Sequence, residues 1–271
     1  MIFILGSPRT GSTLIYQIMI NLYGLFYFTN LTNNYFYKHP FLGSLLSIPF
    51  IRASGYESDH GKTVGLFGPS EGSYIFKNWF GFGSKLIPGQ KNHIVNTFKC
   101  IHSLIHRPIV MKNAWNCFRI QALADLFPLA KFIWIRRDIA DASYSDLTAR
   151  YLRGSPYVWN SAPLPNCIEI QEMPYWKQVV EQQYEYNKMV KTDLETFGSD
   201  NYIELWYEDL CNNLKKQTSL MSSFFNLKTN KATLPKFEMK EHPDNDTDFI
   251  KICEYVKSNM DKFKDYRREG L

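Results

Sequence analysis

The chain opens with a short apolar segment, a loop of small residues and then a helical pattern. Residues 2–5 read Ile-Phe-Ile-Leu, a run too short for a globular helix and typical of a buried strand. Gly6 ends this run, and apolar residues then recur at helical spacing, at Leu14, Ile15, Ile18, Met19 and Leu22. A strand, a tight loop and a helix in succession direct several backbone N–H groups and the positive end of a helix dipole at one point. The pattern therefore predicts an anion-binding site at this loop.

Strand and helix patterns continue to alternate along the rest of the chain. Three further buried strands are predicted, at residues 108–111, 132–135 and 202–206. The main helices are predicted at residues 118–126, from 174 to a stop at Gly198, from after residue 210 to about 225, and at about 248–264. This alternation favours a parallel sheet with crossover helices. We expect residues 1–271 to form a single α/β domain, with a central parallel sheet flanked by helices and a phosphate-loop-like strand–loop–helix unit at the N-terminus.

Two regions are less regular. Residues 23–107 are dense in aromatic residues and glycine, and several prolines interrupt their periodicity. We interpret them as helices and loops that lie over the strand ends and form an acceptor pocket; the alternative is that the aromatic residues fill the core beneath long loops. Residues 228–247 are polar and contain Pro235 and Pro243, which predicts a surface loop or a lid.

Composition narrows the class of ligand and the compartment. The net charge is +5, and the basic residues are dispersed, which indicates a small anionic ligand and no nucleic acid. The five cysteines are widely spaced without a CxxC pair, so we expect no disulfide framework or structural zinc site and a reducing, cytoplasmic location. No run of 18 apolar residues occurs and Arg9 interrupts the first apolar segment, so we expect neither an integral membrane segment nor a signal peptide.

The first loop resembles a phosphate loop with one informative difference. Gly6, Gly11 and Thr13 nearly satisfy the pattern GxxxxGK[ST], but Ser12 stands where a nucleotide kinase carries lysine. That lysine neutralises the β- and γ-phosphates, so this loop would serve a polyphosphate poorly. The cation lies inside the loop instead, at Arg9, whose planar fork suits a terminal group with a flat array of oxygens.

Residues 7–13, Ser-Pro-Arg-Thr-Gly-Ser-Thr, resemble the 5′-phosphosulfate loop of sulfotransferases, which use 3′-phosphoadenosine 5′-phosphosulfate (PAPS). Residues 108–138 resemble the same family, in which a lysine follows the second strand. The tetrapeptide Tyr-Glu-Asp-Leu at residues 207–210 resembles it as well. The resemblance implies transfer of a sulfuryl group from PAPS to a hydroxyl or amine of a small-molecule or carbohydrate acceptor, with no metal. The oligomeric state is left open.

The resemblance also implies roles for individual residues. Lys112 would neutralise charge on the bridging oxygen, Arg137 and Ser145 would bind the 3′-phosphate, and Tyr207 would lie by the adenine. The 5′-phosphosulfate would be held by Ser7, Pro8, Arg9, Thr10, Gly11, Ser12 and Thr13. Arg267 and Arg268 match only loosely the Arg/Lys-Gly segment that closes the cofactor site in the family. Asp138 and Asp141 read instead as the start of a helix, with Asp138 as its N-cap.

One departure concerns the general base. Sulfotransferases of small molecules carry Lys-x-His where this chain has Lys112-Asn113-Ala114, so the histidine base is absent. We favour Glu71, which follows a Gly-Pro-Ser turn and which we expect the aromatic residues of the segment 74–82 to shield from solvent. Several sulfotransferases that lack the histidine use a glutamate, which this placement resembles. The alternative bases are His93, His102 and His106, and then His39 and His60.

Two other functions remain possible from the sequence alone. A phosphate-loop small-molecule kinase would share the fold, although the loop lysine and a magnesium-binding aspartate are missing. A catalytically inactive nucleotide-binding module would explain the missing histidine.

Overall fold

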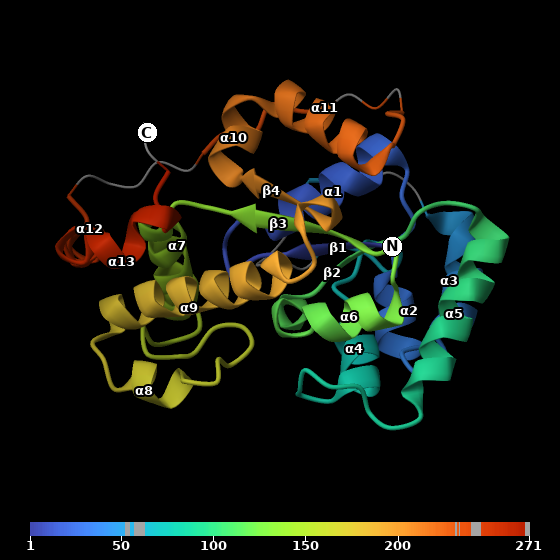
Figure 1. Cartoon of the computed structure of the whole chain (residues 1–271), viewed down its shortest axis with the longest axis horizontal. Helices are drawn as coiled ribbons and strands as arrows, with labels where there is room; N and C mark the ends of the chain where they lie inside the picture. Colours follow the sequence, from blue (N-terminus) through green and yellow to red (C-terminus); the bar gives the residue numbers. More distant parts are fainter. Residues whose placement is uncertain (52–54, 57–62, 231, 233, 240–244, 269–271) are drawn as a thin grey trace.

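The computed structural model describes residues 1–51, 55–56, 63–230, 232, 234–239 and 245–268. At its centre lies a parallel four-stranded sheet of order β2-β1-β3-β4 (Figure 1). The strands are β1 (Ile2–Leu5), β2 (Val110–Lys112), β3 (Lys131–Arg136) and β4 (Tyr202–Trp206). Ile2 pairs with Val110 on one side of β1 and with Lys131 on the other, so β1 is a fully buried inner strand. The predicted α/β class and parallel sheet are confirmed.

Helices cover both faces of this sheet. Those of the N-terminal half are α1 (Ser12–Tyr23), α2 (Asn30–Tyr35), α3 (Pro40–Ser47), α4 (Ser73–Phe80), α5 (Gln90–Ile105) and α6 (Ile120–Leu126), with 3-10 turns at Ile48–Phe50 and Ala114–Phe118. Those of the C-terminal half are α7 (Ile139–Tyr151), α8 (Cys167–Gln171), α9 (Tyr175–Glu195), α10 (Tyr207–Asn212), α11 (Leu214–Phe225), α12 (Thr247–Ser258) and α13 (Met260–Phe263), with 3-10 turns at Ser199–Asn201 and Lys264–Tyr266. None of the described helices combines the length and apolarity needed to cross a bilayer.

The alternation of side chains along β1 divides the core into two layers. Ile2 and Ile4 pack with α1 and α11 on one face, whereas Phe3 and Leu5 pack with α4, α5, α6 and α9 on the other. Figure 1 shows α1, α10 and α11 together above the sheet, with α9 and α6 on the opposite side. The result is a three-layer arrangement in which the strands other than the edge strand β4 are buried on both faces; Glu204 on β4 is exposed.

Three sequence expectations need correction. The predicted helix that ends near residue 225 is α11, and residues 207–210, expected only to lead into it, belong to a separate helix, α10, because the chain leaves helical geometry at Asn213. The last predicted helix likewise breaks at Asn259, between α12 and α13. The second strand begins at Val110 and not at residue 108, since Pro108 has no N–H to donate to the ladder.

Eight of the seventeen aromatic residues of the region 23–107 are buried in the core. These rings are Tyr23, Phe26, Tyr27, Phe28, Phe76, Trp79, Phe80 and Phe98. The alternative interpretation of this region describes these eight rings, and the described residues of 23–107 that line the large cavity are Tyr56, Glu71 and Ser73. The lid predicted at residues 228–247 lies partly outside the described residues, at 231, 233 and 240–244, and stays a prediction.

Candidate active site

A cavity of about 920 Å³ opens at the carboxyl end of the sheet. The loops that follow β1, β2 and β3 all contribute to its wall, together with the start of α10 after β4. In the strand order β2-β1-β3-β4 the chain passes from β1 to β2 in one direction and from β3 to β4 in the other, so the connections that leave β1 and β3 diverge at this edge. Such a switch point is where open α/β sheets bind their ligands.

The loop between β1 and α1 is shaped by two glycines. A Cβ at Gly6 would lie 2.7 Å from Oγ1 of Thr10 and 2.9 Å from the carbonyl of Ile135. Gly11 has φ 85°, and a Cβ there would lie 2.5 Å from the ring of Tyr207. The Thr10 hydroxyl donates to the carbonyl of Ser7 (2.8 Å), which closes the turn between the two glycines. The loop backbone can therefore approach a ligand closely while Tyr207 packs against it.

Arg9 occupies the centre of this loop in a strained conformation. Its φ is 68°, a left-handed value that a residue with a side chain seldom adopts and that clusters at functional sites. Its Nε donates to the hydroxyl of Ser145 on α7 (3.2 Å), and its carbonyl accepts from Nη1 of Arg137 (3.3 Å). Burial lowers the pKa of the Arg9 guanidinium, and the charge of Asp146 opposes that shift. Ser145 and Arg137 both line the cavity, the Ser145 hydroxyl accepts from Arg9, and the contact of both residues with a 3′-phosphate stays a prediction.

Two residues of α9 that were not predicted as site residues hold the loop between β1 and α1 through hydrogen bonds. On α9, Nε2 of Gln183 donates to the carbonyl of Pro8 (2.9 Å), and Nδ2 of Asn187 donates to the hydroxyl of Ser7 (3.3 Å). Both side chains are buried. The only sequence signal was a pair of amides on the predicted core-facing side of a long helix, where apolar residues are usual.

Lys112, at the end of β2, connects the loop to Glu71. Its Nζ donates to Oγ1 of Thr13 (3.1 Å) and forms a short ion pair with the Glu71 carboxylate. The backbone of Glu71 is fixed in turn, because Nδ2 of Asn113 donates to its carbonyl (3.0 Å). Three segments far apart in the sequence thus place a hydroxyl, an ammonium and a carboxylate side by side in one cavity.

The expected shielding of Glu71 by aromatic rings is not observed. Tyr74 and Phe82 are exposed, whereas Phe76 and Trp79 are buried in the core, and 29% of the Glu71 side chain remains accessible. Its main neighbour is the ammonium of Lys112. The alternative histidines 39, 93, 102 and 106 do not line the cavity, and His60 lies outside the described residues.

Arg137 and Tyr207 form the third part of the site. The Arg137 guanidinium lies 4.7 Å from the centre of the Tyr207 ring, and burial raises the pKa of the Tyr207 phenol to about 12. The Nε of Arg137 is buried without a hydrogen-bond partner. An unpaired guanidinium N–H beside a cavity is costly unless a ligand accepts from it.

The C-terminal arginines lie outside the cavity wall. Nε of Arg267 pairs with Asp138 (3.0 Å), and Nη2 of Arg268 pairs with both oxygens of Asp209 (2.7 and 2.8 Å). Asp138 also caps α7, as predicted, by accepting from the amide of Ala140. These arginines close the C-terminal segment onto the domain, and their predicted contact with the donor stays a prediction.

Comparison with known proteins agrees with this architecture. No curated protein matches the chain. Among solved structures, a sulfotransferase from Alicyclobacillus acidocaldarius superposes with a TM-score of 0.54 at 14% identity, covering 100% of this chain and 96% of that one. Sulfotransferase STF9 from Mycobacterium avium superposes with a TM-score of 0.54 at 13% identity, covering 95% of this chain and 67% of that one. The sulfotransferase domain from the curacin biosynthetic pathway superposes with a TM-score of 0.51 at 17% identity, covering 100% of this chain and 92% of that one.

At these identities the superpositions establish a shared fold. A family model described as the sulfotransferase family matches residues 66–231. That match covers more than half of the sequence and includes Glu71, Lys112, Arg137, Ser145 and Tyr207. The chain therefore belongs to the sulfotransferase family.

Proposed function

We propose that this protein transfers a sulfuryl group from PAPS to a hydroxyl or amine of a small-molecule or carbohydrate acceptor. The observation that carries the proposal is the position of Lys112, whose ammonium contacts both Thr13 of the anion-binding loop and the Glu71 carboxylate. A charge-neutralising cation and a candidate base meet beside a loop suited to a terminal anion. The five free thiols suit a reducing compartment, and we propose the cytoplasm as the location.

The residues of the cavity fit a donor that carries two separate anionic groups. Arg9 and Lys112 lie at the loop, where the N-terminus of α1 also favours an anion. Arg137 lies beyond them with an unpaired Nε, and Tyr207 offers a ring face beside it. PAPS would supply a sulfuryl group activated by its 5′-phosphate, and its 3′-phosphate would accept from Arg137.

Each charged residue then has a distinct task. Arg9 and the loop amides hold the terminal group and stabilise charge on its outer oxygens. Lys112 neutralises negative charge as it develops on the oxygen of the leaving phosphate, and a prepositioned charge of this kind is commonly the largest contribution to catalysis. Glu71 accepts the proton of the attacking hydroxyl or amine. Thr13 and Asn113 keep the ammonium and the carboxylate in place.

Ligand-dependent stability tests the donor assignment. The product 3′-phosphoadenosine 5′-phosphate (PAP), at about a hundred times its dissociation constant, should stabilise the protein by roughly 2.7 kcal/mol without magnesium. Arg9→Ala should remove most of this stabilisation. Arg107→Ala, which alters an exposed arginine after α5, is the matched control and should keep it.

The competing functions predict different results. Equal stabilisation by ATP with magnesium would indicate a kinase and overturn the proposal. PAP binding without turnover of labelled PAPS, over a panel of hydroxyl and amine acceptors, would indicate an inactive nucleotide-binding module.

A further inference from the structure

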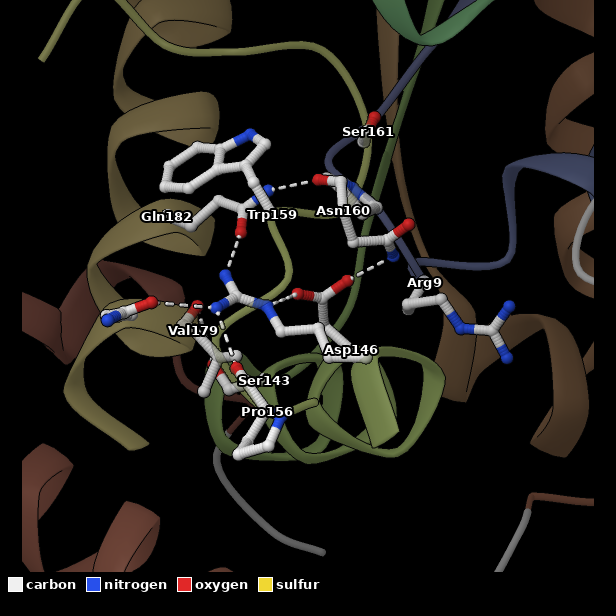
Figure 2. Close-up of polar contacts among 12 residues, drawn as sticks. Arg9, Ser143, Asp146, Pro156, Trp159, Asn160, Ser161, Val179 and Gln182 are labelled. Atoms are coloured by element: carbon white, nitrogen blue, oxygen red, sulfur yellow. Dashed lines mark hydrogen bonds and ion pairs between the residues drawn. The ribbon is translucent and has the colours of Figure 1, made fainter. Parts of the chain in front are cut away.

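One side of the cavity has no part in the transfer chemistry proposed above. It is formed by Ala149 near the C-terminal end of α7, by Leu152 and Arg153, which follow the helix, and by residues 160–162. This side, which we call the α7 wall, stands next to Arg9 (Figure 2). Residues that line the same cavity as the donor loop without serving it are candidates for acceptor recognition.

A buried polar network fixes the α7 wall. Asp146 and Arg150, both on α7, form an ion pair (3.2 Å) in which neither side chain is exposed. The second oxygen of Asp146 accepts from Nδ2 of Asn160 (2.6 Å), and Nε2 of Gln182 donates to the carbonyl of Asn160 (2.7 Å). Figure 2 shows Asn160 joined by dashed lines to Asp146 on one side and to Gln182 on the other. Such fully partnered networks hold the attached chain in one position.

The next residue of the wall is strained. Ser161 has φ 77°, an unusual value for a residue with a side chain, and it lines the cavity. The hydroxyl of Tyr186 donates to the carbonyl of the following residue, Ala162 (2.5 Å), which holds the segment in place. Strain of this kind persists only where the surroundings enforce it and clusters at binding sites.

One helix positions both sides of the cavity. On α9, Gln183 and Asn187 hold the donor loop, whereas Gln182 and Tyr186 hold the α7 wall. The spacing between a bound donor and a molecule on the wall is therefore set by a single rigid element, as group transfer requires.

Arg153 gives the α7 wall its charge. It is exposed and lines the cavity, and its guanidinium has no ion pair or side-chain hydrogen bond within the part of the chain that the structure describes. The cavity is lined by four cationic side chains, Arg9, Lys112, Arg137 and Arg153, and by two carboxylates, Glu71 and Glu238. Glu71 pairs with Lys112, and Glu238 pairs with Lys236 outside the wall (3.5 Å).

Arg153 lies eight residues after Ser145, beyond the C-terminal end of α7, and its charge is near enough to Arg9 to help lower the pKa of that guanidinium. We propose that the acceptor carries an oxyanion, a carboxylate or a sulfate ester, which the guanidinium fork of Arg153 binds. The body of the acceptor lies on Ala149 and Leu152, and its polar groups face Asn160 and Ser161. This assignment of the acceptor class rests on the proposed sulfuryl transfer.

Binding of matched acceptor pairs tests the assignment without requiring turnover. The probes are glucuronic acid against glucose, 4-hydroxybenzoate against 4-hydroxybenzamide, and N-acetylglucosamine 6-sulfate against N-acetylglucosamine. Each is titrated by ligand-observed NMR into the full chain, with and without saturating PAP. The anionic member of at least one pair should bind about tenfold more tightly than its neutral partner, because one charge-assisted contact is gained.

Variants separate the possible outcomes. Arg153→Gln should abolish the preference for the anion and leave PAP affinity unchanged, and Arg107→Gln should alter neither. A preference that persists in Arg153→Gln, an absence of preference in all three pairs, or a tenfold loss of PAP affinity in Arg153→Gln would each overturn the assignment. Failure of the proposed function appears separately, as a wild-type protein that does not bind PAP.

Discussion

The ammonium of Lys112 lies between the Glu71 carboxylate and the hydroxyl of Thr13, which is 3.1 Å away. One cation therefore touches both the candidate base and the anion-binding loop. A bound donor would compete with Glu71 for this ammonium, which would free the carboxylate to face the acceptor. Binding of a donor at the loop would therefore make the Glu71 carboxylate available as the base.

The first prediction concerns Glu71 as the base. Glu71→Gln keeps the shape and removes the basicity, so kcat should fall about a hundredfold or more while PAP affinity is retained. Glu238→Gln, which alters the other carboxylate of the cavity wall, is the control for charge and should change kcat less than twofold. Normal turnover in Glu71→Gln together with loss of turnover in His102→Ala or His106→Ala would show that a histidine is the base.

Lys112 should matter more for the transition state than for product binding. PAP lacks the transferred group, so Lys112→Met should weaken PAP binding modestly and lower kcat about a hundredfold or more. Steady-state kinetics and calorimetry measure the two effects. A loss of PAP affinity as large as the loss of kcat would mean that Lys112 only holds the donor.

Arg137 should discriminate between nucleotides. Its unpaired Nε and its place on Tyr207 make it the candidate partner of a 3′-phosphate. Arg137→Ala should weaken PAP binding at least about tenfold, as expected for loss of a charged hydrogen bond, and should hardly change the affinity for adenosine 5′-phosphate. Equal losses for both ligands would assign Arg137 to the fold instead.

The strands were the most predictable part of the fold. The predicted fourth strand matches β4 at both ends, and β1 also agrees: β1 is a run of buried apolar residues that Gly6 ends, and β4 alternates buried Ile203 and Leu205 with less buried neighbours. The short helix α10 was not predicted, since its six residues are too few to show a helical period before the chain turns at Asn213.

The candidate site was predictable where residues follow strands. Lys112 is the last residue of β2 and Arg137 comes directly after β3, and the carboxyl ends of parallel strands share one edge. Gln183 supports the donor loop from α9, and Asn160 and Arg153 line the cavity from segments after α7; their positions depend on tertiary packing, which periodicity does not show. Periodicity also could not tell whether Phe28 or Trp79 faces a pocket or the core, because both positions are apolar in either case.

Removing one charge of the buried ion pair beneath the α7 wall should destabilise the fold, because the other charge would stay buried alone. Burial raises the pKa of Asp146, and the neighbouring Arg150 opposes this shift. Asp146→Ala would leave Arg150 buried without its counter-charge, which should cost about 3–5 kcal/mol of unfolding free energy in urea denaturation. The exposed pair Glu185–Lys188 is the control, and Glu185→Ala should cost less than about 1 kcal/mol.

The double variant Asp146→Leu with Arg150→Met separates the effect of the ion pair on fold stability from its effect on the position of Asn160. Replacing both charges by apolar residues of similar size should restore most of the lost stability. Asn160 would still lose its partner, so acceptor KM should rise while PAP affinity is unchanged. Wild-type KM in this double variant would show that the network serves the fold alone.

Gly11 and Gly198 both have positive φ, but only Gly11 is crowded. A Cβ at Gly11 would lie 2.5 Å from the Tyr207 ring, whereas a Cβ at Gly198 would meet nothing within 4 Å. Backbone strain alone should cost Gly11→Ala about 1–2 kcal/mol and Gly198→Ala up to about 3 kcal/mol, because φ 78° with ψ 155° at Gly198 is a conformation that almost only glycine adopts. Gly11→Ala must in addition displace Tyr207 or the loop, so calorimetry should find PAP affinity reduced at least tenfold in this variant only. Unchanged PAP affinity in Gly11→Ala would mean that the loop can move away from Tyr207 without cost, and that close contact between them has no part in holding the donor.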